Sequence, residues 1–157
     1  SGLGDIERAA GRLFPPGRIP DPEDSFPISR LEQAVDEGLL FVVDIAGSAV
    51  GFATCSLMNN RLHLDELSVH PDHGRRGYGR ALVQKVIDTA LEHALDGVSL
   101  TTFADIPWNA PFYASMGFRT LPEAEQDAAL FEALAHERAI GLTERVAMFR
   151  DSRTGIS

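Results

Sequence analysis

A strand-like run, a glycine-rich turn and a long amphipathic helix follow one another between residues 62 and 95, and a second strand-like run covers residues 98–103. The helical part carries a wide apolar stripe at helix spacing: Leu82, Val83, Val86, Ile87, Ala90, Leu91, Ala94 and Leu95. Gly97 is predicted to end this helix. Strands joined through one helix pair in parallel with a right-handed crossover. This segment therefore predicts an α/β fold.

The rest of the chain adds antiparallel strands and further helices. Residues 39–57 read as a hairpin with a tight turn at Ala46, Gly47 and Ser48, and residues 62–69 as the next strand. Helices are predicted at 4–14, from an N-cap at Ser29 to Gly38, in a short segment that Gly117 ends, and at 123–140; strands are predicted at 118–121 and 143–150. We expect one domain over residues 1–157, with a mixed, mostly antiparallel central sheet flanked by helices.

Charge and composition exclude several classes of protein. The net charge of −9 argues against a nucleic-acid partner, because backbone phosphates require a basic face. The longest clean apolar run, residues 39–43, is too short to span a bilayer, so no membrane partner is expected. The first residues lack the pattern of a secretory signal, which favours a cytoplasmic protein. Cys55 is the only cysteine; we expect it in the core, and we expect no disulfide, cysteine cluster or metal site.

The turn "HPDHGRRGYGRALV" at residues 70–83 concentrates positive charge on a flexible backbone. Gly77 and Gly79 let main-chain amides turn toward one point, and such a nest at a helix N-terminus binds phosphate. The alternative is a plain strand-to-helix turn. A P-loop is excluded because no G-K-[ST] is present, and a dinucleotide site because position 82 is leucine and no acid ends the next strand.

The segment "LDELSVHPDHGRRGYGRALV" resembles the Gcn5-related N-acetyltransferase (GNAT) superfamily, whose R/Q-x-x-G-x-G/A signature follows its fourth strand and grips the pyrophosphate of acetyl-CoA. Gly74 stands where that signature has arginine or glutamine. A second segment, "NAPFYASMGF" at residues 109–118, is similar to the family's N-x-x-A-x-x-F-Y-x-x-x-G-F pattern. The resemblance covers about residues 40–120. It implies the GNAT fold, acetyl-CoA as cosubstrate, and a coenzyme-binding loop of Gly74, Arg75, Arg76, Gly77, Tyr78, Gly79 and Arg80.

The resemblance also implies roles in the reaction. The family's fourth and fifth strands splay apart around the pantetheine arm, so the backbone of Leu67, Ser68 and Val69 is expected to pair with that arm, and an amide there to face the thioester oxygen. Asn109 matches the asparagine that bonds the cofactor, and Tyr113 the tyrosine that protonates the departing thiolate. The structural alternative is a capped short helix, with Asn109 as the cap and Tyr113 as core.

Deprotonation of the acceptor amine requires a base, directly or through water. Strand alternation places His63 and Asp65 on one face and Glu66 on the other. Asp65 and Glu66 resemble the paired acids of polyamine acetyltransferases, and His63 with Asp65 resembles the histidine spacing of arylalkylamine acetyltransferases. We rank His63 and Asp65 above Glu66. Each of the three has an ordinary strand role as its alternative.

The resemblance implies direct transfer of an acetyl group to a primary amine of a small molecule or peptide in a ternary complex, without a covalent role for Cys55. Acidic residues gather before the hairpin and favour a cationic amine, with a solvated acidic face as the alternative: Asp21, Glu23, Asp24, Glu32, Asp36 and Glu37. A noncatalytic acyl-CoA sensor and a plain α/β interaction module are the rival functions. The oligomeric state stays open, with a homodimer as one possibility.

Overall fold

The computed structural model describes residues 5–6, 28–74 and 76–152 of the 157-residue chain. The chain divides into two compact units, one drawn from residues 1–56 and 64–89 and the other from residues 57–63 and 90–157. The expectation of one domain over residues 1–157 stays a prediction. Apart from Asp5 and Ile6, which are helical, the helix predicted at 4–14 lies outside the described residues.

The first unit is built on the predicted hairpin. Strands β1 (Leu40–Ile45) and β2 (Ser48–Met58) pair antiparallel. Ala46 and Gly47 make the two-residue turn with φ values of 54° and 86°, a conformation whose twist matches that of the flanking strands. Strand β3 (Arg61–Val69) follows after the turn at Asn59 and Asn60. The predicted strands 39–57 and 62–69 are thus confirmed to within a few residues.

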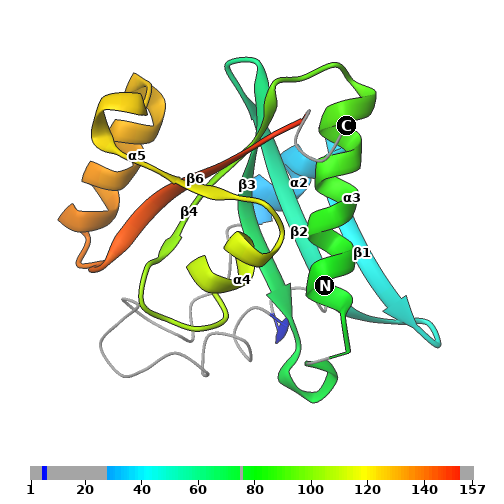
Figure 1. The fold of residues 1–157 in the computed structure, drawn as a ribbon. Helices are drawn as coiled ribbons and strands as arrows, with labels where there is room; N and C mark the ends of the chain where they lie inside the picture. The colour runs from blue at the N-terminus through cyan, green and yellow to red at the C-terminus, as the bar shows by residue number, and fades with distance from the viewer. Residues whose placement is uncertain (1–4, 7–27, 75, 153–157) are drawn as a thin grey trace. The chain divides into compact units, whose positions relative to one another are not determined.

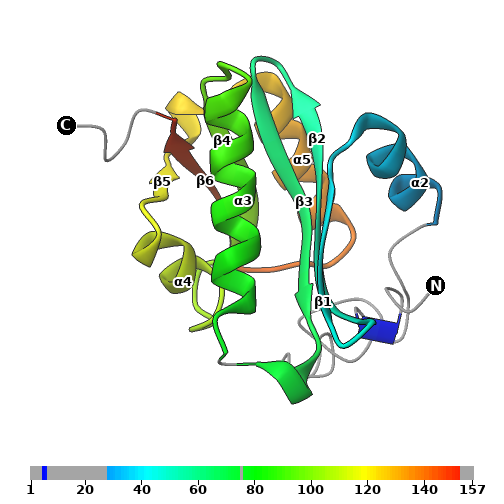
Figure 2. The same ribbon diagram turned by 90° about the vertical axis from the view of Figure 1, so that its right-hand side faces the viewer.

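Two helices cover the strands of this unit on opposite faces. Helix α3 (Tyr78–Glu92) lies on one face and α2 (Ile28–Glu37) on the other (Figures 1 and 2). The predicted apolar stripe of α3 is largely buried, with Val83, Val86 and Ala90 fully inaccessible. Gly38 ends α2 with a φ of 72°, as predicted. The N-cap prediction was wrong, because α2 begins at Ile28 and includes Ser29.

The predicted end of α3 was also wrong. The helix stops at Glu92, and Ala94 takes the left-handed conformation with a φ of 57°. Gly97 is instead the first residue of strand β4 (Gly97–Phe103). A Cβ atom there would collide with the Arg150 carbonyl oxygen and lie 2.7 Å from the Phe149 Cζ atom. Close packing between strands, and not helix termination, therefore requires this glycine.

The second unit contains the remaining strands. After β4 come helix α4 (Ala110–Ser115), strand β5 (Arg119–Leu121), helix α5 (Ala128–Ala139) and strand β6 (Arg145–Asp151). Both β4 and β5 pair antiparallel with β6. The helix predicted at 123–140 is in fact a 3₁₀ turn (Glu123–Glu125) followed by α5. Leu130 and Leu134 of α5 pack with Leu121 and Ala147 in a buried cluster.

Hydrogen bonds link the six strands of the described residues in the order β1-β2-β3-β4-β6-β5. The pair β3 and β4 is parallel, with Leu62 opposite Val98 and His63 opposite Ser99. These two residue pairs are the only ones described between β3 and β4, although β3 continues to Val69 and β4 to Phe103. The sheet is therefore mixed and mostly antiparallel, as predicted. No helix in the described part of the chain is long and apolar enough to cross a membrane.

Candidate functional site

The glycine-rich loop connects β3 to α3 in the first unit. Pro71–His73 form a 3₁₀ turn, in which His70 Nδ1 accepts a hydrogen bond from the Asp72 N–H at 3.1 Å. The Gly74 N–H donates to the Pro71 carbonyl at 3.1 Å, so Gly74 ends this turn and its amide is already bonded. Gly77 has a φ of 84°, a left-handed conformation that favours glycine. Gly77 is therefore the position at the start of α3 where the backbone conformation favours glycine.

The backbone of α3 begins directly after Gly77. The Ala81 N–H donates to the Gly77 carbonyl at 2.9 Å, which is the first bond of the helix. The N–H groups of Gly77, Tyr78 and Gly79 precede this bond and have no intrahelical acceptor. The side chains of Arg76 and Arg80 are exposed at this end, and Arg75 lies outside the described residues. Amides without an intrahelical acceptor, the helix dipole and two guanidinium groups give this end of α3 a positive electrostatic potential, which favours an anion.

The side chains of β3 alternate between the two faces, as the sequence predicts. Ser68 Oγ donates to Glu66 Oε1 at 3.0 Å, so these two residues share one face. Ser68 is buried, whereas Leu67 and Val69 are half-buried. Asp65, also half-buried, lines a pocket beside α2.

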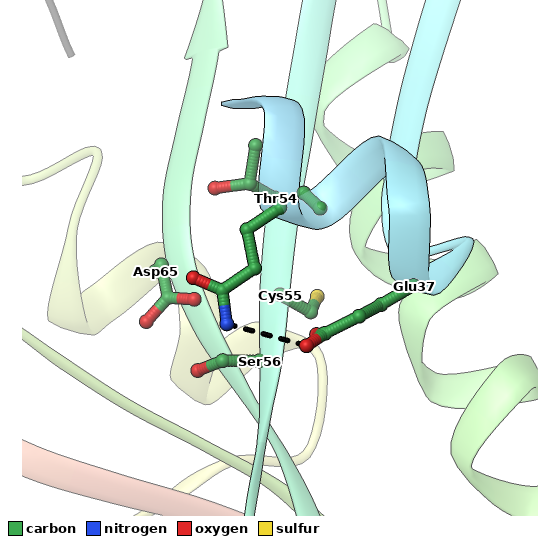
Figure 3. Close-up of a pocket in the computed structure, with 7 residues that line it drawn as sticks. Glu37, Thr54, Cys55, Ser56 and Asp65 are labelled. Carbon is green, nitrogen blue, oxygen red and sulfur yellow. Dashed lines mark hydrogen bonds between the residues drawn. The ribbon is translucent and has the colours of Figure 1, made fainter. Parts of the chain in front are cut away.

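That pocket has a volume of about 250 Å³ and lies between α2 and the strands β2 and β3 (Figure 3). We call it the Thr54 pocket; its lining residues are Gln33, Ala34, Glu37, Thr54, Cys55, Ser56 and Asp65. Sequence reasoning took the segment around Cys55 as core and missed the polar lining. The signal was present, because alternation along β2 places Thr54 and Ser56 together on the face opposite that of the Cys55 side chain. Cys55 itself is 2% exposed, and burial raises the pKa of its thiol.

His63 belongs to the second unit and lies in a buried polar network. Arg61 Nε donates to Ser99 Oγ at 2.8 Å, and the same Oγ atom is hydrogen-bonded to His63 Nδ1 at 2.9 Å. Arg61 also forms a two-pronged ion pair with Asp127, at 2.6 and 3.2 Å. Burial, and secondarily the Arg61 charge, lower the pKa of His63 from 6.5 to about 4. His63 is therefore neutral at pH 7.

Asn109 and Tyr113 lie at the start and the middle of the short helix α4, in the second unit. Tyr113 is 6% exposed, and its ring contacts those of Phe112 and Phe118 edge-on, with centroids 5.1 and 5.7 Å apart. Asn109 occupies the N-cap position, but its side chain makes no capping hydrogen bond. Its Oδ1 atom is buried and has no hydrogen-bond partner. Capping therefore does not account for this amide.

The predicted site residues are thus divided between the units. The first unit brings together Asp65, Glu66, Leu67, Ser68 and Val69 with the glycine loop, and the second holds His63, Asn109 and Tyr113. Within residues 5–6, 28–74 and 76–152, no group of three or more histidine, cysteine, aspartate or glutamate side chains is placed to hold a metal ion.

The family model described as the acetyltransferase (GNAT) family matches residues 5–118, which is most of the chain. The chain belongs to the GNAT acetyltransferase family. The resemblance of the sequence to the GNAT superfamily is therefore confirmed.

Solved structures share the fold of this GNAT protein at low identity. The ribosomal-protein-S18-alanine N-acetyltransferase of Escherichia coli has a TM-score of 0.67 at 20% identity, over 94% of this chain and 84% of its own. The Rv2747 protein of Mycobacterium tuberculosis, in complex with CoA, gives 0.69 at 17%, over 96% and 93%. The PaiA N-acetyltransferase of Thermoplasma acidophilum, also in complex with CoA, gives 0.64 at 12%, over 94% and 89%. These likenesses establish the GNAT fold.

Proposed function

We propose that the protein is an acetyl-CoA-dependent N-acetyltransferase that transfers the acetyl group directly to a primary amine in a ternary complex. The observation that carries this proposal is the left-handed Gly77, with a φ of 84°, at the mouth of α3 in a chain of the GNAT family. A diphosphate fits there because the amides of Gly77, Tyr78 and Gly79 have no intrahelical acceptor. The CoA in the Mycobacterium tuberculosis and Thermoplasma acidophilum structures supports this choice of cosubstrate.

The remaining cofactor contacts follow from the same reasoning. Arg76 and Arg80 are proposed to close on the phosphate oxygens from outside. The Leu67–Val69 backbone is proposed to pair with the pantetheine arm. Asn109 Oδ1, buried without a partner, is suited to accept a hydrogen bond from an amide N–H of that arm. This buried acceptor without a hydrogen-bond partner is a second observation that supports coenzyme binding.

Among the three predicted bases we now favour Asp65. The Nδ1 atom of His63 is held by Ser99, and its pKa of about 4 makes it a weak proton acceptor. Glu66 accepts the Ser68 hydroxyl at 3.0 Å. Asp65 is half-buried and lines the pocket of about 250 Å³ beside α2, which has room for a small polar group. We therefore propose that Asp65 takes the amine proton, directly or through one water molecule.

Charge and protons are balanced by two further groups. Acetyl-CoA supplies the acyl thioester; a backbone amide of β3 is proposed to stabilise the charge that develops on the thioester oxygen, a contribution of about 3 kcal/mol. Tyr113 is proposed to donate its proton to the sulfur. With reference pKa values near 10 for a phenol and 8.5 for a thiol, this transfer is uphill by about 2 kcal/mol. The reaction yields an amide, free CoA and the original protonation states once Asp65 returns its proton to solvent and Tyr113 is reprotonated.

Coenzyme release with a panel of primary amines tests this function. We expect turnover with acetyl-CoA, a loss of about a hundredfold in kcat for Asp65→Asn, and a change below about threefold for Glu66→Gln, the matched neighbouring carboxylate. Tyr113→Phe, which keeps the packed ring, is expected to lower kcat by about tenfold or more. Tight CoA binding without turnover on any amine would favour the sensor. A protein that does not bind CoA at all would be an interaction module.

A further inference from the structure

The lining of the Thr54 pocket is acidic. Two of its seven lining residues are the carboxylates Glu37 and Asp65, and its described lining includes no lysine, arginine or histidine. In Figure 3 the two carboxylates approach the pocket from opposite sides, Glu37 from α2 and Asp65 from β3. Glu37 is exposed and Asp65 is half-buried, and the carboxylate oxygens of both favour a cation in the pocket.

Thr54 supplies a second, independent sign of a ligand. Its side chain is 1% exposed, and its Oγ1 atom is buried with no hydrogen-bond partner. Buried hydroxyl groups are normally paired, because an unpaired one costs free energy. Thr54 lines the same pocket as Glu37 and Asp65, so its hydroxyl is placed to accept a bond from a group that enters.

Glu37 is held in place by its own helix. Gln33 Nε2 donates to Glu37 Oε1 at 3.2 Å, one turn earlier on α2 (dashed line in Figure 3). This bond orients the carboxylate toward the pocket and uses one of its four lone-pair sites. The remaining acceptor capacity, together with the Thr54 hydroxyl, matches an ammonium group, which offers three N–H donors and no acceptor.

We propose that the Thr54 pocket binds a second, non-reacting ammonium group of the acceptor, which makes the substrate class a diamine. This inference rests on the proposed function and names its acceptor. Glu37 and the Thr54 hydroxyl are assigned to this ammonium, whereas Asp65, on the opposite side of the pocket, remains the proposed base for the reacting nitrogen, which must be neutral for acyl transfer. A fixed ammonium in the pocket instead orients the acceptor and leaves the other nitrogen free to react.

Isothermal titration with matched amine pairs tests the proposal without any need for turnover. The probes are α,ω-diamines of three to six carbons and the amino alcohols in which a hydroxyl replaces one ammonium, with and without CoA. At least one diamine should bind about tenfold tighter than its amino alcohol, as expected for a charge-assisted bond. Thr54→Val and Glu37→Gln should each bring that ratio close to one, whereas Thr54→Ser and the exposed charge-matched Glu132→Gln should preserve it.

The outcomes separate this inference from the proposed function. If no diamine binds better than its amino alcohol, or if Thr54→Val keeps the wild-type ratio, the diamine site is wrong even when simple amines are acetylated. If the preference holds but no amine is acetylated, the transferase function fails and the cation site stands. Thr54→Val is expected to unfold at no lower a temperature than the wild type, because it removes an unpaired buried hydroxyl. A folded Thr54→Val protein therefore makes its loss of binding interpretable.

Discussion

His63 Nδ1 lies 2.9 Å from Ser99 Oγ, and the parallel register of β3 and β4 places these two residues opposite each other. The serine hydroxyl also accepts a hydrogen bond from Arg61 Nε at 2.8 Å, so the three side chains form one polar network. His63 is 7% exposed, which leaves water little access to a charged form. Protonation of His63 is therefore disfavoured both by the burial of its ring and by the nearby positive charge of Arg61.

The stability of the protein should depend on pH through His63. The pKa of His63 is about 4 in the folded state against 6.5 when exposed, so the unfolded chain binds more protons between these values. Stability is then complete above about pH 6.5 and falls as the pH drops to about 4, by a contribution on the order of 3 kcal/mol. Urea unfolding at pH 7 and pH 4.5 measures this loss. His63→Asn, which keeps an acceptor for Ser99 and does not titrate, should lose clearly less; an equal loss would rule out His63 as its source.

Asp127 joins two structural roles that substitutions can separate. It pairs with Arg61, and its Oδ1 accepts the Leu130 N–H at 3.0 Å as the N-cap of α5. Asp127→Ala removes both, and we expect a loss of about 2–3 kcal/mol in the free energy of unfolding. Asn is also a good N-cap residue, so Asp127→Asn should cost about half as much. Chemical denaturation of both variants checks this, and equal losses would mean that capping contributes nothing.

The same carboxylate predicts a second pH effect at lower values. The hydrogen bonds from Arg61, and secondarily from Leu130 and Asn59, hold the pKa of Asp127 well below its usual range despite an opposing effect of burial. Its contribution is present above the unfolded value of 3.8 and is lost as the pH falls below that value. Acid unfolding monitored by circular dichroism should thus shift to a higher pH in Asp127→Asn. An unchanged midpoint would contradict this reading of the ion pair.

Gly97 should tolerate no side chain. A Cβ atom there would meet the Arg150 backbone and the Phe149 ring, so Gly97→Ala must displace β4 from β6 or force the ring aside. We expect a loss of about 3 kcal/mol, at the upper end for overpacking. Gly47→Asn is the control, because a Cβ atom at this turn would meet no atom within 4 Å and asparagine tolerates a positive φ. A thermal shift of similar size in both variants would show that packing at Gly97 is looser than the structure indicates.

Local patterns predicted much of this fold. The apolar stripe from Leu82 to Ala90 and the Ala46–Gly47 turn depend only on residues that are close in the sequence, and both were located correctly. Gly97 was misassigned because its requirement comes from Arg150 and Phe149, which are more than fifty residues away. Helix α5 begins at Ala128 because Asp127 caps it, a signal that the sequence did contain.

In the candidate site, too, local features were predictable and long-range contacts were not. The turn between β3 and α3 was predictable because its glycine spacing is local, and Gly77 in it has a positive φ. The protonation and the hydrogen-bond partner of His63 were not predictable, because strand alternation indicates on which face of the sheet a side chain lies but not what it contacts. Its pairing with Ser99 depends on the parallel register of two strands separated by the whole of α3. The Thr54 pocket was missed because its lining comes from three elements, α2, β2 and β3.

The central claim is that main-chain N–H groups at Gly77 hold the diphosphate of CoA, and isothermal titration of CoA against two glycine variants tests it most directly. Gly77 and Gly47 both have a positive φ, and at both positions an added Cβ atom would meet no neighbour within 4 Å, so Gly77→Val and Gly47→Val impose a similar local strain. We expect Gly77→Val to weaken CoA binding by about tenfold or more, and Gly47→Val to leave the affinity unchanged. Equal, wild-type affinity in both variants would contradict the claim.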